Sequence, residues 1–186
     1  MRSNTAINIP NILTLVRLLC APLFVILLLQ DLRVHALLVF TLAGITDGLD
    51  GWIARWLDQR TLLGAYLDPA ADKLLLVSAF ICLAMAGIIP DWLAVVVLSR
   101  DILIVVGIAI FSIAQKKVHM RPSRVSKCTT AAQTMMVIAA LAVSIFAEFA
   151  WVRIVLIWVT ATLTVVSGLH YLYVGMNILQ QGEETA

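Results

Sequence analysis

Apolar stretches of membrane-spanning length recur along the whole 186-residue chain, and they limit its fold more than any other feature. We count six, separated by short joints that carry charged and turn-forming residues. They cover approximately residues 10–30, 34–55, 64–88, 91–114, 125–147 and 150–176. About 20 helical residues, each rising about 1.5 Å, cross the roughly 30 Å hydrocarbon layer of a bilayer. The sequence therefore predicts an all-α integral membrane protein with six transmembrane helices.

The composition favours a single membrane domain over residues 1–186. Hydrophobic residues make up 62% of the chain and charged residues 13%, whereas a soluble domain averages about 25% charged residues. We expect residues 1–9 to form an interfacial lead-in and residues 177–186 a cytoplasmic tail. The three cysteines are dispersed, without the spacing of a disulfide or zinc site. We expect no nucleic-acid partner.

The positions of lysine and arginine predict the orientation. One set of joints and ends carries eight cations: Arg2, Arg55, Arg60, Lys116, Lys117, Arg121, Arg124 and Lys127. The opposite set carries only Arg33 and Arg153. Cytoplasmic loops hold the excess of positive residues, so we expect both the N- and C-termini in the cytoplasm. The inner membrane of a bacterium is the expected location.

Four aspartates flank the joint between the second and third apolar stretches, in the segment DGLDGWIARWLDQRTLLGAYLDPAADK. Asp47 and Asp50 are three residues apart, and Asp68 and Asp72 are four apart, so each pair shares one helix face. Counted inward from the joint, Asp50 and Asp68 lie about 6–8 Å deep, and Asp47 and Asp72 about 12 Å deep. If the two faces turn toward each other, four carboxylates converge just below the cytoplasmic membrane surface. We expect Asp58, in the joint itself, to be solvated.

Four carboxylates this close resist simultaneous ionisation, because like charges repel and membrane depth removes water. Divalent cations relieve the repulsion, and a site made only of oxygen ligands suits Mg²⁺, Mn²⁺ or Ca²⁺. Ionisable residues at membrane depth are functional by default. Three other interpretations stay open: a solvated helix end, a cation transporter that uses the same carboxylates, and a catalytically silent scaffold.

Small residues line the same part of the second stretch, at Ala43, Gly44, Gly48 and Gly51. Such a strip lets helix backbones approach closely, either for simple packing or to make room for a ligand. Pro69 follows Asp68 directly, so we expect a freed carbonyl or a kink at that point of the third stretch.

Eight positions within 26 residues form a specific pattern, D-x-x-D-G-x-x-A-R, then eight residues, then G-x-x-x-D-x-x-x-D. It is met without a gap by Asp47, Asp50, Gly51, Ala54, Arg55, Gly64, Asp68 and Asp72. This pattern resembles the signature of the CDP-alcohol phosphatidyltransferases. A domain of six membrane spans is also what that family has, so the resemblance covers nearly the whole chain.

The resemblance implies a chemistry for these residues. Two divalent ions, Mg²⁺ or Mn²⁺, grip the pyrophosphate of CDP-diacylglycerol, an acceptor hydroxyl attacks the lipid-side phosphorus, and CMP leaves. By position, Asp47, Asp50 and Asp68 resemble metal ligands, while Asp72 resembles the general base with a share in metal binding. The expected CDP-binding residues are Gly48, Gly51, Ala54, Arg55 and Gly64. The family usually forms homodimers, so a homodimer is expected here too.

Cations on the later stretches are candidates for binding the acceptor or its phosphate. Arg100 lies deep in the fourth stretch beside Asp101, where it forms either a structural ion pair or a contact to an anionic headgroup. Lys73 pairs either with Asp72 or with phosphate. Arg121, Arg124 and Lys127 precede or open the fifth stretch, although Arg121 also fits a simple membrane anchor.

Two further polar groups extend this picture. Thr130 and Gln133 follow Lys127 by one and two helical turns, which suggests a pocket wall. Asn11, Thr14 and Arg17 recur every three residues on the first stretch and are expected to support the site, as in the glycerol-transferring branches of the family.

Those branches use a glycerol-type acceptor. The segments SRD at 99–101 and RPSRVSKCTTAAQ at 121–133 resemble the eukaryotic-type cardiolipin-forming branch, for which the acceptor is phosphatidylglycerol. The alternative is glycerol 3-phosphate, which gives phosphatidylglycerophosphate. Serine and inositol acceptors are more remote.

Overall fold

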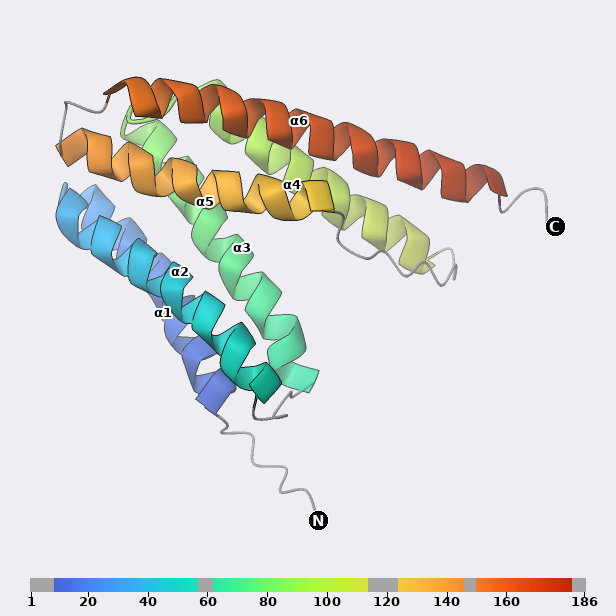
Figure 1. Cartoon of the computed structure of the whole chain (residues 1–186), viewed down its shortest axis with the longest axis horizontal. Coiled ribbons are helices and arrows are strands. Elements are labelled where there is room, and N and C mark those ends of the chain that lie inside the picture. The colour runs from blue at the N-terminus through green and yellow to red at the C-terminus, as the bar shows by residue number, and fades with distance from the viewer. Residues whose placement is uncertain (1–8, 57–61, 114–123, 146–149, 182–186) are drawn as a thin grey trace, which may run out of the picture.

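The computed structural model describes residues 9–56, 62–113, 124–145 and 150–181, and its regular structure in these ranges is entirely helical (Figure 1). The helices are α1 (Ile9–Leu29), α2 (Arg33–Trp56), α3 (Leu62–Met85), α4 (Asp91–Ile113), α5 (Arg124–Ile145) and α6 (Ala150–Gln181). Each coincides with one of the six apolar stretches, so the all-α prediction is confirmed. The largest differences are at two C-terminal ends, where α3 stops three residues early and α6 continues five residues further.

Tight turns that cap the preceding helices make the two shortest connections. After α3, Gly87 adopts a left-handed φ of 66°, its N–H donates to the carbonyl of Ala84, and Ile88 N–H donates to that of Leu83. This is the Schellman arrangement, in which glycine reverses the chain without a Cβ clash. It explains why α3 ends at Met85. The turn after α1 has the same pattern of hydrogen bonds. Asp31, with a φ of 57°, takes the place of the glycine.

Consecutive helices run antiparallel, so the start of α1, the end of α2 and the start of α3 lie at one end of the molecule (Figure 1). Helix α1 packs against both α2 and α3, and α6 packs against both α4 and α5. Contacts of α3 with α4 and α5, and of α2 with α5, join these groups. The sequence predicted α2 and α3 as direct neighbours, but in the described residues these two helices make at most a minor contact with each other. Helix α1 packs closely against both of them instead.

The interior of the bundle is apolar in one half and polar in the other. Fully buried Phe24, Phe80, Leu83 and Leu141 belong to one hydrophobic cluster, near the ends of α1, α3 and α5. Buried polar side chains lie toward the opposite ends: Thr14, Arg17, Arg100, Asp101, Thr129, Gln133, Thr160, Thr164 and Ser167. Large apolar side chains such as Leu19 and Ile102 are exposed on the outer faces, as expected for a lipid-facing surface.

Three helices are long and apolar enough in their described residues to cross a membrane, over Asp91–Ile110, Val125–Ile145 and Trp151–Asn177. The described parts of α1 and α2 contribute the shorter apolar stretches Thr14–Leu29 and Arg33–Thr46. Helix α3 continues through Pro69 without a break in its helical assignment.

Candidate active site

The acidic signature is divided between the last turns of α2 and the first turns of α3. These parts of the two helices lie at the same end of the molecule (Figure 1). The side chains of most signature residues lie outside the described residues, namely Asp47, Gly48, Asp50, Gly51, Ala54, Arg55, Gly64 and Asp68. The same holds for the side chains of Asn11 and Arg124, and for all of Arg121. Convergence of the four carboxylates therefore stays a prediction.

Asp72, the last acid of the signature, is described, and it is paired with α1. Arg17 NH1 donates to Asp72 Oδ1 at 2.8 Å. The guanidinium side chain is only 1% exposed, whereas 37% of the aspartate side chain remains exposed. Thr14, one turn before Arg17, is also buried. Of the polar residues that the sequence placed on the first stretch, Arg17 is the one whose contact with α3 the structure describes.

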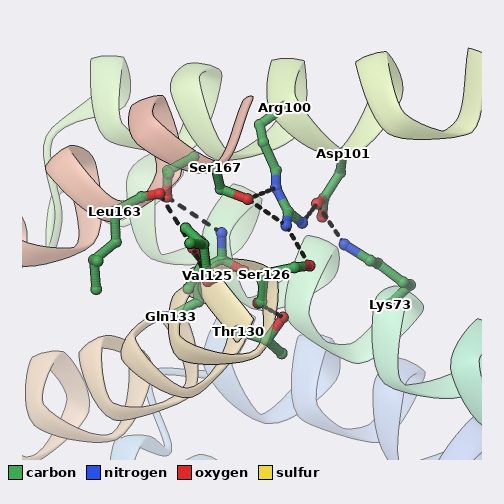
Figure 2. Close-up of polar contacts among 11 residues, drawn as sticks. Lys73, Arg100, Asp101, Val125, Ser126, Thr130, Gln133, Leu163 and Ser167 are labelled. Carbon is green, nitrogen blue, oxygen red and sulfur yellow. Dashed lines mark hydrogen bonds and ion pairs between the residues drawn. The ribbon is translucent and has the colours of Figure 1, made fainter. Parts of the chain in front are cut away.

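Lys73, the next residue, is paired with a different helix, α4. Its ammonium group forms an ion pair with Asp101 Oδ1 of α4 (Figure 2). Arg100 NH1 donates to the same carboxylate oxygen at 2.8 Å. Asp101 thus holds two cations from two helices, while its own side chain is 9% exposed. Of the two sequence interpretations of Arg100, the ion pair is the one observed.

Arg100 also reaches α5 and α6. Its NH2 group donates to Ser126 Oγ at 2.7 Å and to Ser167 Oγ at 2.8 Å, and Nε lies 3.3 Å from Ser167 Oγ. The guanidinium carbon lies 5.8 Å from the centroid of the Tyr171 ring, within the range of a cation–π contact. Arg100 is 5% exposed, and the partners that Figure 2 shows converging on it, Asp101, Ser126 and Ser167, hold its guanidinium inside the bundle.

Hydroxyl and amide groups continue the network between α5 and α6. Gln133 Nε2 donates to Thr164 Oγ1 at 3.4 Å, and Thr129 Oγ lies 3.1 Å from the Leu163 carbonyl. Thr130 donates to the Ser126 carbonyl on its own helix. Gln133 is 1% exposed, and its Oε1 has no hydrogen-bond partner among the described residues. The predicted pocket wall is thus a helix–helix contact in the described structure, whereas Lys127 is exposed.

No residue of α6 was predicted from sequence to belong to the site. Thr160, Thr164 and Ser167 are all fully buried and recur at intervals of four and three residues. Such a stripe on an otherwise apolar helix is the signal that could have revealed the contribution of α6. Asp101 was noted only as a neighbour of Arg100, and its second partner, Lys73, lies 28 positions earlier in the chain.

A bundle of membrane-length helices with an apolar exterior and paired charges inside defines a class of polytopic membrane proteins that handle charged groups at membrane depth. Comparison with known sequences identifies the family within that class. A sequence model of the CDP-alcohol phosphatidyltransferase family matches residues 7–166. The chain belongs to this family.

Curated relatives carry two names. The human cardiolipin synthase (CMP-forming) is 33% identical over 190 aligned residues, which cover 93% of this chain and 63% of the human protein. A cardiolipin synthase (CMP-forming) of Streptomyces coelicolor is 39% identical over 59% of this chain and 54% of that protein. A probable phosphatidylglycerophosphate synthase of Mycobacterium tuberculosis is 43% identical over 51% of this chain and 48% of that protein. The chain therefore matches less than two thirds of the length of each of these relatives.

Proposed function

We propose that this protein transfers the phosphatidyl group of CDP-diacylglycerol to a glycerol-type acceptor and releases CMP. The observation that carries the proposal is the complete eight-residue signature, from Asp47 to Asp72, in a chain that belongs to the CDP-alcohol phosphatidyltransferase family. The curated relatives are named as synthases that form CMP or a phosphatidylglycerol phosphate. A cation transporter needs a polar path across the membrane, and the apolar half of the described interior offers none.

The donor set fits divalent cations. In this proposal Asp47, Asp50 and Asp68 hold two Mg²⁺ or Mn²⁺ ions, and Asp72 has a share in them. Hard divalent ions prefer carboxylate oxygens. When bound, they would neutralise the pyrophosphate and stabilise charge on the leaving phosphate. Backbone and side chains at Gly48, Gly51, Ala54, Arg55 and Gly64 would contact the CDP part of the substrate.

Asp72 is the proposed general base. The acceptor hydroxyl gives its proton to the carboxylate of Asp72, its oxygen forms a bond to the lipid-side phosphorus, and the bond from that phosphorus to the CMP oxygen breaks. Two structural features support this role. The carboxylate is held on one side by Arg17, and more than a third of its side chain is exposed.

The acceptor is proposed to bind on the cationic side of the site. The candidates are Lys73, Arg121, Arg124 and Lys127. Lys127 is exposed at the start of α5, whereas Lys73 would have to exchange its ion pair with Asp101 for the phosphate of the acceptor. Arg100 is the weaker candidate for direct contact, because its donors are already engaged by Asp101, Ser126 and Ser167. Its part in acceptor binding would require an anion to displace a serine.

Phosphatidylglycerol is the leading acceptor, which would make the product cardiolipin. The human relative, which aligns with 93% of this chain, is named as a cardiolipin synthase. Glycerol 3-phosphate is the second candidate, favoured by the 43% identity to the Mycobacterium tuberculosis protein over half of the chain. Both acceptors offer a primary hydroxyl and a phosphate, so the chemistry at Asp72 is the same.

The proposed setting is a six-span bundle in a bacterial inner membrane, with both termini and the acidic signature on the cytoplasmic side. The eight-to-two distribution of cations supports this orientation. A homodimer is also proposed, and its only support is that members of the family usually form homodimers.

The test is a side-by-side assay of the purified full chain with CDP-diacylglycerol and Mn²⁺ or Mg²⁺. One reaction contains phosphatidylglycerol, a second glycerol 3-phosphate, and a third no acceptor. Mass spectrometry of the lipid products and CMP release are measured together. We expect CMP release only with an acceptor and a divalent ion, loss of activity with EDTA, and recovery when the metal is restored. Absence of CMP release with both acceptors would overturn the proposal.

A further inference from the structure

Helix α1 contacts both helices that carry the acidic signature, α2 and α3. Its sequence contains a single charged residue, Arg17, and that residue is 2% exposed. A guanidinium at membrane depth is stable only when an anion compensates it. The anion here is Asp72, the acid to which the proposed function assigns proton transfer.

The two partners of this ion pair differ in their surroundings. Arg17 lies on α1, which packs against α2 and α3, and only 1% of its side chain is exposed, so close packing restrains its position. Asp72 keeps 37% of its side chain exposed. Its Oδ1 therefore accepts a 2.8 Å hydrogen bond from a restrained donor, while part of the side chain stays accessible.

We propose that Arg17 is a positioning residue that reserves Asp72 for the acceptor hydroxyl. This inference rests on the proposed function. By holding Oδ1, Arg17 orients the carboxylate and neutralises part of its charge. Asp72 then contributes less to metal binding than Asp47, Asp50 and Asp68 do. The contact that orients Asp72 thus comes from a residue outside the signature.

The proposal predicts opposite effects on metal binding and on turnover. Replacing Arg17 by methionine makes the site more negative by one unit charge, so Mn²⁺ binds more tightly, roughly five-fold or more at the short distances involved. Turnover falls at the same time, because the carboxylate loses its fixed orientation. Lysine keeps the charge but is a point donor without the planar fork of arginine. Arg17→Lys should therefore leave Mn²⁺ affinity within about two-fold and lower kcat roughly ten-fold.

The experiment uses detergent-purified full-length protein and two independent readouts. Free Mn²⁺ is titrated by electron paramagnetic resonance without substrate, and kcat and KM are measured with CDP-diacylglycerol and the active acceptor. Arg33→Lys is the matched control, because Arg33 also pairs with an aspartate, Asp31, at 2.7 Å but at an exposed turn. We expect wild-type values for that control and unchanged KM values for Arg17→Lys.

Three results would overturn the inference. They are wild-type kcat in Arg17→Lys, unchanged Mn²⁺ affinity in Arg17→Met, and a raised acceptor KM with unchanged kcat, which would make Arg17 a substrate contact. If Arg17→Met is not recovered folded, Arg17→Gln removes the charge while keeping a hydrogen-bond donor and takes its place. A wild-type protein that releases no CMP would overturn the proposed function, whereas an active wild type with an unaffected Arg17→Lys would overturn only the inference about Arg17.

Discussion

Asp72 and Asp101 both form ion pairs with cations, yet their surroundings suit different tasks. Asp101 is 9% exposed and accepts two cations, Lys73 and Arg100, on the same oxygen. Asp72 has Arg17 on one side and remains partly exposed on the other. A carboxylate that accepts a proton from a substrate must be accessible to that substrate. A carboxylate that only pairs with buried cations does not need to be accessible. These surroundings agree with the proposed proton transfer by Asp72 and with a stabilising role for Asp101.

Asp72→Asn should abolish turnover and preserve the fold. The amide oxygen can still accept a hydrogen bond from Arg17, but it cannot take a proton from the acceptor. We expect CMP release to fall by at least about 100-fold, which is the usual contribution of a general base. Size-exclusion elution should stay as in the wild type. Asp31→Asn is the control, since Asp31 is exposed at the opposite end of α1 and asparagine tolerates its positive φ. Activity that persists in Asp72→Asn would remove Asp72 as the base.

Asp101→Asn should destabilise the protein strongly. It removes the counter-charge of Arg100, which is 5% exposed, and the ion-pair partner of Lys73. An uncompensated buried charge costs about 3 kcal/mol or more. The midpoint of unfolding in an SDS titration measures the loss. Asp31→Asn breaks an exposed pair and should cost less than about 1 kcal/mol. Equal midpoints for the two variants would show that the buried network contributes no stability.

The helices themselves follow from apolar length, and their ends follow from turn residues. The sequence predicted the third stretch to continue to residue 88, but Gly87 in the left-handed region ends α3 at Met85. At the other extreme, α6 has 32 residues, so it is about 48 Å long and exceeds the bilayer core. An apolar pattern predicts the part of such a helix that lies in the membrane. It does not predict how far the helix continues through polar residues beyond the membrane.

The turn after α3 provides a test in which the same substitution has opposite effects at two glycines. A Cβ at Gly87 or at Gly107 would meet nothing within 4 Å, so only the backbone matters. At Gly87, with φ at 66°, alanine should cost about 1–2 kcal/mol. At Gly107, inside α4, alanine should add about 0.5–1 kcal/mol of stability. SDS unfolding midpoints of the two variants should move in opposite directions, and a shared direction would contradict the turn described here.

The partners within the candidate site were less predictable than the residues. Polarity at membrane depth identified Asp72, Lys73 and Arg100 from sequence alone, and the family resemblance added Arg17. Their pairing joins residues 55 positions apart for Arg17 and Asp72, and 67 apart for Arg100 and Ser167. Such pairs depend on which helices pack together, and a helical repeat within one segment carries no information about that. The interpretation of Lys73 as a partner of Asp72 or of phosphate accordingly missed Asp101.

Across the whole molecule, charge and apolarity are separated along the helix axes. The buried polar side chains lie in the first halves of α1 and α5 and near the middle of α4 and α6. Near the opposite ends of the bundle, Trp92 and Trp151 begin α4 and α6 and are exposed, as expected for an aromatic belt at a membrane surface. The end with the polar network is also the end to which the sequence assigns eight cations. Both features favour one orientation, with the site at the cytoplasmic surface.

Cysteine labelling tests that orientation directly. Cys20, Cys82 and Cys128 are first replaced by alanine, and a single cysteine is then introduced as Asp31→Cys or Glu183→Cys. A membrane-impermeant maleimide added to intact spheroplasts should label Asp31→Cys, which lies in the exposed turn between α1 and α2. It should label Glu183→Cys only after the membrane is opened, because the cation-rich side is held in the cytoplasm. The reverse pattern would place the acidic signature on the outer surface. CDP-diacylglycerol would then have to be supplied from outside the cell, and the proposed function would lose its source of substrate.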